Sequence, residues 1–153
     1  MGKTRNTGLT TNSKGNPNDE TNSVDTKLEE LSVKNTPFNS SNLSYVDSAN
    51  KYENYLLDKN HKDGGSKAKF LSETLGYNKG DGVKLHNAIS EAINGKTPDT
   101  VTKTIYGTKC TFSTKIKGND GKYHHANVIV VIQQDNGKTT WRLITIMPGK
   151  KDK

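Results

Sequence analysis

The stretch Val128-Ile129-Val130-Val131-Ile132 decides the fold, because five consecutive β-branched residues leave a strand without a polar face. Such a run is typical of a strand that is buried on both faces at the centre of a sheet. Turn signals flank it, with Gly118-Asn119-Asp120-Gly121 before it and Asp135-Asn136-Gly137 after it, and both favour hairpins. Consecutive antiparallel strands are therefore predicted: Val101–Tyr106 and Lys109–Lys117 alternate with period two, Val128–Ile132 is the central strand, and Thr139–Met147 is the last strand after the second hairpin.

Before Pro98 the apolar spacing is helical. A short helix is predicted through Tyr52, Tyr55 and Leu56, ending before the turn Lys59-Asn60-His61. A second helix is predicted from about Ser66, as its N-cap, to Leu75, with Gly76 after its end, and a third from the N-cap Asp81 to Gly95. We therefore expect an α+β fold, with N-terminal helices packed on one face of a C-terminal antiparallel sheet of about four strands. The other face would stay free for a ligand.

The first part of the chain has a different composition. Residues 1–42 are dominated by Asn, Thr, Ser, Gly and Lys, with only a short helical pattern over Asp25–Val33. Such a segment buries too little apolar surface to offset its ordering entropy. We expect residues 1–42 to form a flexible leader and residues 43–150 to form the folded domain.

The basic charge of the chain lies in this expected domain. Residues 1–50 carry five Lys or Arg and six Asp or Glu, whereas residues 51–153 carry eighteen Lys or Arg and ten Asp or Glu. A small domain with this surplus favours polyanionic partners such as nucleic acid, although a lysine-rich surface that only keeps the protein soluble explains it equally well. The apolar runs are too short for a membrane span, and we expect none.

Cysteine and histidine usage argues against a metal site. Cys110 is the only cysteine, so no internal disulfide and no cysteine zinc cluster is expected, and its place in a strand pattern predicts a core residue. Of the four histidines, His124 and His125 are adjacent and would point to opposite faces of a strand. We expect neither a metal nor a cofactor.

The segment His61-Lys62-Asp63-Gly64-Gly65-Ser66-Lys67-Ala68-Lys69-Phe70 carries the strongest chemical signal. It places an imidazole, a diglycine turn and lysines at a helix start, where unpaired N–H groups and the macrodipole already favour anions. RNA cleavage without a metal needs a base for the ribose 2′-OH, an acid for the leaving 5′-oxygen and cations for the phosphorane. His61 suits the proton transfer, since its unperturbed pKa lies near neutrality, while Lys67 and Lys69 suit the phosphate.

The other half of such a site should lie on the sheet. We nominate hydroxyl groups for catalysis, cations for phosphate binding and aromatic rings for stacking on unpaired bases. Each residue also has a structural explanation, as a solvated lysine, an edge arginine, a turn histidine or a core tryptophan. The candidates are Thr108 and Thr139 for catalysis, and Tyr106, Trp141, Arg142 and Lys62 for substrate binding.

Several motifs together resemble a family of small bacterial domains found at the C-termini of polymorphic toxins, including contact-dependent growth inhibition proteins. The resemblance covers about Tyr52 to Met147, with Cys110 where the family pattern has an aromatic residue. The motifs are Tyr55-Leu56-Leu57-Asp58, His61-x-x-Gly64-Gly65-x-Lys67-Ala68-x-Phe70, Leu75-Gly76-Tyr77, Thr104-Ile105-Tyr106-Gly107-Thr108-Lys109-Cys110 and Trp141-Arg142-Leu143-Ile144-Thr145.

The resemblance implies a ribonuclease of the barnase/EndoU/colicin/RelE-like fold, acting on RNA, plausibly tRNA, and neutralised by a cognate immunity protein that is acidic. It also implies that residues 1–42 join the domain to a parent delivery protein, which is secreted or displayed at the cell surface. The domain would then act in the cytoplasm of a target bacterium. Two alternatives stay open: a nucleic-acid-binding module without catalysis, and an adaptor whose basic face docks an acidic protein.

Overall fold

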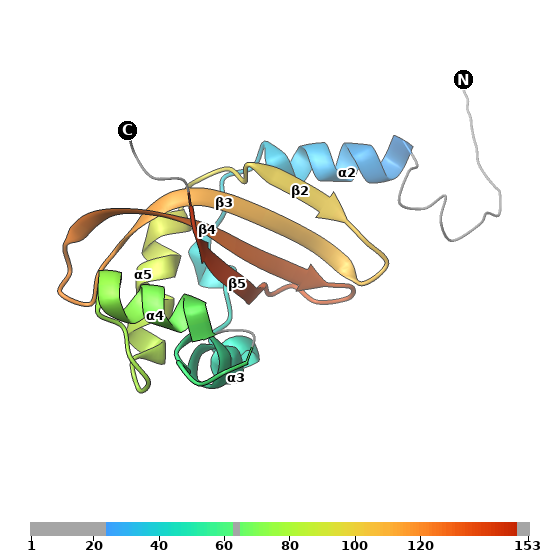
Figure 1. Cartoon of the computed structure of the whole chain (residues 1–153). Coiled ribbons are helices and arrows are strands. Elements are labelled where there is room, and N and C mark those ends of the chain that lie inside the picture. Colours follow the sequence, from blue (N-terminus) through green and yellow to red (C-terminus); the bar gives the residue numbers. More distant parts are fainter. Residues whose placement is uncertain (1–23, 63–64, 150–153) are drawn as a thin grey trace, which may run out of the picture.

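The structure, a computed structural model, describes residues 24–62 and 65–149. Four antiparallel strands form one sheet in the order β2-β3-β4-β5 (Figure 1). The strands are β2 (Thr100–Lys103), β3 (Gly107–Lys117), β4 (Tyr123–Asp135) and β5 (Arg142–Pro148). The run Val128–Ile132 lies in β4 between β3 and β5, which confirms the prediction of a central strand.

The helices precede the sheet in the chain. They are α2 (Val24–Lys34), α3 (Ala49–Lys51) with the π-helical turn η3 (Tyr52–Leu56), α4 (Gly65–Leu75) and α5 (Gly82–Ile93); two short 3-10 turns, η1 (Ser40–Asn42) and η2 (Val46–Ser48), connect α2 to α3. The α+β fold with N-terminal helices and a C-terminal antiparallel sheet is therefore confirmed. None of the described helices is long and apolar enough to cross a membrane.

One face of the sheet packs against α4 and α5, which lie on the same side in Figure 1. Alternate residues of β3 and β4 are buried there, and the helices contribute one apolar stripe each. Burial raises the pKa of the Cys110 thiol to about 12, so this cysteine is an inert core residue, as predicted. The core includes Cys110, Phe112, Ile116, Val128, Val130 and Ile132 from the strands and Leu71, Leu75, Leu85, Ile89 and Ile93 from the helices.

The positions of the helix ends are determined partly by local sequence and partly by tertiary contacts. Gly76 and Gly95 have φ values of 79°, which places both in the left-handed region expected after a helix. Asp81 stands at the N-cap position of α5, but its side chain makes no capping hydrogen bond. Glu53 takes that role, accepting from the N–H groups of Gly80 at 2.7 Å and Gly82 at 2.8 Å.

Order begins earlier in the chain than the expected boundary at residue 43. Helix α2 covers the short helical pattern over Asp25–Val33 and lies along the edge strand β2 (Figure 1). Glu30 Oε2 accepts the backbone N–H of Lys103 at 2.6 Å, and Glu29 forms an ion pair with the Lys103 ammonium. Residues 24–42 are therefore part of the folded unit, and the flexible leader, where expected over residues 1–23, lies outside the described residues.

The edge strand β5 is not regular. Val131 pairs with Thr145 and the next residue, Ile132, pairs with Leu143, so Ile144 is an extra residue on β5. This β-bulge explains why Leu143 and Ile146 are both buried although three positions separate them. Bulges of this kind turn neighbouring side chains away from the regular alternation, and Thr145 is such a neighbour.

Candidate functional site

A tight turn between η3 and α4 positions His61. Asp58 accepts the N–H of Asn60 through Oδ1 at 3.0 Å and the N–H of His61 through its carbonyl at 3.1 Å. The His61 carbonyl in turn accepts the N–H of Gly65 at 2.9 Å, so His61 is held immediately before the first turn of α4. A Cβ at Gly65 would lie 2.7 Å from the carbonyl oxygen of Lys59, which shows that the turn closes only around a glycine.

His61 and Lys67 meet at the side chain of Tyr55. The imidazole of His61 lies edge-on to the Tyr55 ring, with ring centroids 4.8 Å apart. The Lys67 ammonium lies 5.2 Å from the centroid of the same ring and donates to its hydroxyl at 3.1 Å. Tyr55 belongs to the π-helical turn η3, a geometry that is frequent at functional sites.

Thr145 brings the sheet into this group. Lys67 Nζ donates to Thr145 Oγ1 at 3.0 Å, and the threonine lies beside the bulge of β5. Lys51 completes the arrangement, with its ammonium 5.1 Å from the Tyr55 ring centroid. We call Lys51, Tyr55, His61, Lys67 and Thr145 the Tyr55 cluster.

The hydrogen bonds of Lys67 leave the hydroxyl protons of Tyr55 and Thr145 available to a ligand. An ammonium has donors only, so the hydroxyl oxygens of Tyr55 and Thr145 both act as acceptors toward Lys67. Each hydroxyl therefore keeps its own O–H group for another acceptor, such as a phosphate oxygen. Lysine thus orients two further donors as well as supplying charge.

The charge of the cluster is not neutralised internally. Within the described part of the chain, neither Lys51 nor Lys67 forms an ion pair with a carboxylate. Two ammonium groups next to one aromatic ring favour an anionic ligand, because bringing them together costs Coulomb energy that a bound anion offsets. The cluster therefore combines two ammonium groups and two hydroxyl donors, which suit an anion, with an imidazole beside them.

Two of the lysines predicted for the site lie next to the cluster without joining it. Lys69 is exposed on α4, two positions from Lys67, and residues two apart do not share a helix face. Lys62 is exposed in the turn that follows His61. Both can attract a polyanion at long range. Among the described residues, we observe no hydrogen bond or cation–π contact from either lysine to Tyr55 or Thr145.

Thr108 and Tyr106 lie elsewhere on the sheet. Thr108 pairs with Gln134 on the far side of β4 from β5, which puts it two strands away from Thr145. It is buried and lines a small cavity beside α2 with Glu29 and Glu30. Tyr106 is 71% exposed in the turn between β2 and β3.

The remaining candidates lie around the connection between β4 and β5. Trp141 is buried against Phe38, with ring centroids 5.8 Å apart, so it is a core residue and not a surface for base stacking. Arg142 Nε donates to Asp135 at 2.8 Å, an ion pair that lowers the pKa of the Asp135 carboxyl. Thr139 is exposed in the turn itself.

The other described histidine side chains make their contacts outside the Tyr55 cluster. His124 pairs with Asp120 at 2.9 Å and lines a cavity with Leu75 and Gly76, at the opposite end of α4 from Lys67. His86 Nδ1 and the buried Tyr52 hydroxyl share a hydrogen bond of 2.9 Å. Among the described residues, no group of three or more His, Cys, Asp or Glu side chains could hold a metal ion.

Tyr55 and Thr145 were not predicted as site residues, although both occur in motifs of the resemblance. Tyr55 opens the motif Tyr55-Leu56-Leu57-Asp58 and Thr145 closes Trp141-Arg142-Leu143-Ile144-Thr145. Their presence in two separate motifs was the available signal, since a residue type alone does not show which threonine reaches the lysine.

Comparison with known proteins identifies a family but assigns no role to the Tyr55 cluster. The model of a family described as a domain of unknown function, DUF6883, matches residues 39–150. The matched region contains the whole Tyr55 cluster and all four strands, whereas α2 precedes it. No curated protein and no solved structure matches the chain. Because the matched region spans most of the length of the chain, the chain belongs to the DUF6883 family.

Proposed function

We propose that the domain is a metal-independent ribonuclease whose active site is the Tyr55 cluster. The observation that carries the proposal is Lys67, which is hydrogen-bonded to hydroxyls from a helix and from the sheet while His61 lies against the same tyrosine. An imidazole, an ammonium and two hydroxyl donors are sufficient for cleavage of a phosphodiester by its own 2′-hydroxyl.

In this mechanism His61 acts as the general base. Its imidazole accepts the proton of the ribose 2′-OH while the 2′-oxygen forms a bond to phosphorus. Lys67 and the Thr145 hydroxyl stabilise the negative charge of the phosphorane. The Tyr55 hydroxyl donates its proton to the 5′-oxygen as the P–O5′ bond breaks, and the products are a 2′,3′-cyclic phosphate and a free 5′-hydroxyl.

The imidazolium of His61 and the phenolate of Tyr55 left by this step are neighbours, since their rings lie 4.8 Å apart. A water molecule can therefore carry the proton back from His61 to Tyr55 and restore both groups. Lys51 and Lys67 stabilise the phenolate while it exists, because both ammonium groups lie near the Tyr55 ring.

The biological setting of the proposal comes from the resemblance to polymorphic toxin domains. The substrate would be RNA, plausibly tRNA, and a cognate immunity protein of acidic character would block the enzyme. A parent delivery protein would carry the domain out of the producing cell, and the cytoplasm of a target bacterium would be its place of action. Residues 51–153 carry eighteen Lys or Arg and ten Asp or Glu, and this positive net charge fits both an RNA substrate and an acidic inhibitor.

The proposal is tested by incubating the purified chain with total tRNA in the presence of EDTA. We expect cleavage that leaves 2′,3′-cyclic phosphate ends, and a loss of about 100-fold or more in the rate for His61→Ala and Lys67→Met. Lys69→Ala is the matched control, because this lysine is exposed on the same helix outside the cluster.

Intact tRNA at micromolar protein would contradict the proposal, as would a His61→Ala variant with the wild-type rate. Binding of RNA without cleavage would favour the alternative of a non-catalytic nucleic-acid-binding module. Growth arrest on expression of the domain without an immunity protein separates a toxin from an adaptor, because an adaptor is not expected to stop growth.

A further inference from the structure

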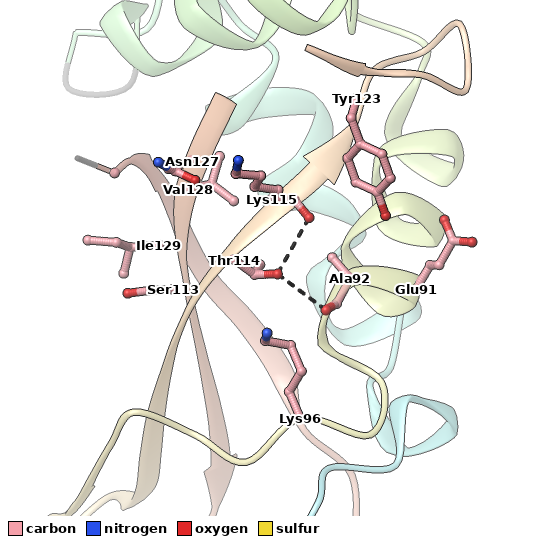
Figure 2. A pocket seen from close by; sticks show the side chains of 11 residues that line it. Glu91, Ala92, Lys96, Ser113, Thr114, Lys115, Tyr123, Asn127, Val128 and Ile129 are labelled. Carbon is pink, nitrogen blue, oxygen red and sulfur yellow. Dashed lines mark hydrogen bonds between the residues drawn. The ribbon is translucent and has the colours of Figure 1, made fainter. Parts of the chain in front are cut away.

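A second surface feature lies apart from the Tyr55 cluster, where the end of α5 meets the ends of β3 and β4 (Figure 2). It is a cavity of about 900 Å³ that shares no residue with the cluster. This volume lies within the range of known small-molecule sites and is large enough for a nucleotide. We call it the α5–sheet pocket; its lining residues include Lys96, Ser113, Thr114, Lys115, Tyr123 and Asn127.

Tyr123 forms one wall of the α5–sheet pocket. Its side chain is 54% exposed, and Figure 2 shows its ring beside the opening with the hydroxyl directed toward Glu91. The Lys117 ammonium lies 5.6 Å from the ring centroid and pairs with Glu91 at 3.3 Å. These contacts hold an aromatic ring at the surface, which is the arrangement on which an unpaired base stacks.

The polar lining favours an anion with hydroxyl groups. Lys96 contributes an exposed ammonium group, while Glu91 is the only carboxylate among the described residues that line the pocket and is already paired with Lys117. The Thr114 hydroxyl lies 3.4 Å from the carbonyl oxygens of Ala92 and Lys115, as the dashed lines of Figure 2 show. Hydrogen bonds of that length are weak, so this hydroxyl can turn toward a ligand at little cost.

We propose that the α5–sheet pocket is a binding site for a nucleotide of single-stranded RNA, outside the catalytic centre. Tyr123 stacks on the base, and Lys96 contacts a neighbouring phosphate. The proposal rests on the proposed function, since it assigns a place to the strand beyond the scissile bond. A nucleotide fits better than an acidic protein segment, because a carboxylate chain uses the lysine but not the exposed ring.

The test measures binding to a fluorescent single-stranded oligonucleotide made of 2′-O-methyl RNA. This probe lacks the 2′-hydroxyl and cannot be cleaved by the proposed mechanism, so binding is separated from catalysis. We expect Tyr123→Ala to raise the Kd at least about fivefold, and Tyr123→Phe to bind like the wild type because it keeps the ring. Val83→Ala is the control for removing an exposed apolar side chain, since Val83 is 55% exposed on α5 and lies outside the pocket.

The charge contribution is tested with the variant Lys96→Ala. Removing one phosphate contact should reduce the slope of log K against log salt by about 0.7, whereas the control Lys79→Ala, an exposed lysine in a turn, should change it less. A duplex probe should bind more weakly than the single strand, because paired bases cannot stack on Tyr123.

Wild-type binding by Tyr123→Ala and by Lys96→Ala would overturn the pocket proposal, even if the protein cleaves tRNA. Conversely, pocket-dependent binding by a protein that cleaves no RNA would support the pocket and overturn only the ribonuclease function. Equal affinity for the duplex and the single strand would also overturn the assignment to an unpaired nucleotide.

Discussion

The ammonium of Lys67 and the hydroxyl of Thr145 lie 3.0 Å apart, although 78 positions separate the two residues in the sequence. This hydrogen bond joins the first turn of α4 to the edge strand β5 beside its bulge. Lys67 is therefore oriented by the sheet, and the cluster forms only when the two halves of the fold pack together.

Thr145→Val should lower the rate of RNA cleavage by about 100-fold while leaving the fold intact. Valine has nearly the same shape as threonine but neither accepts from Lys67 nor donates to a phosphate oxygen, and the loss of one such donor has an effect of this size. Single-turnover kinetics and a thermal melt check the two parts of the prediction. Thr139→Val, in the exposed β4–β5 turn, should keep the wild-type rate; a similar loss in both variants would contradict a specific role for Thr145.

Tyr55→Phe should cleave RNA at least about 100-fold more slowly and bind it with nearly unchanged affinity. Phenylalanine keeps the ring contacts with His61, Lys51 and Lys67 but removes the proposed proton donor. Binding to the uncleavable 2′-O-methyl probe and cleavage of tRNA are measured on the same preparation. A Tyr55→Phe variant that cleaves at the wild-type rate would show that the leaving oxygen takes its proton from another group.

Gly65→Ala should destabilise the protein by about 1–3 kcal/mol and reduce activity further than its stability explains. The added Cβ would lie 2.7 Å from the Lys59 carbonyl oxygen, and the turn that holds His61 would have to open. Urea unfolding gives the free-energy change, and cleavage at a temperature where both proteins are folded gives the activity. Ser66→Ala changes an exposed neighbour on α4 and should alter neither quantity by a comparable amount.

The stability of the protein should fall between pH 7.5 and pH 5 in a way that depends on His86. Burial lowers the pKa of His86, so the folded state favours the neutral imidazole, which is hydrogen-bonded to the Tyr52 hydroxyl at 2.9 Å. The stability that this group contributes is complete above the unfolded pKa of about 6.5 and is lost as the pH falls through the lower folded value.

His86→Gln checks this pH dependence, because the glutamine amide oxygen can still accept from Tyr52 but does not titrate. Urea midpoints of the variant should vary less between pH 7.5 and pH 5 than those of the wild type. His124→Gln is the control, since His124 is exposed beside Asp120. An unchanged pH dependence in His86→Gln would assign the effect to other groups.

The parts of the fold that depend on local sequence could be predicted from it. The central strand, the two hairpins and the helix ends at Gly76 and Gly95 follow from patterns within a few residues, and all are present. Helix α2 was underestimated because its own apolar pattern is weak, and contacts with β2 stabilise it. The cap of α5 was assigned to Asp81 because the capping pattern is local, whereas Glu53 comes from a different helix.

The candidate site could be predicted only in part for a similar reason. His61 and Lys67 lie near each other in the chain, and both belong to the cluster. Thr145 could not be chosen among many threonines, because the bulge at Ile144 breaks the alternation from which the direction of its side chain would be inferred. Trp141 was nominated for its ring type, but burial depends on the contact with Phe38 and not on residue type.

The hydrogen bond from the backbone N–H of Lys103 to the Glu30 carboxylate affects how separate molecules associate. It occupies a donor on the outer edge of β2, where a strand from another molecule would otherwise bind. Helix α2 lies before residue 39, so a chain shortened to the matched region 39–150 would lose this cover. Such a chain would keep the residues of the Tyr55 cluster and yet tend to extend its sheet between molecules, so its solubility would fall.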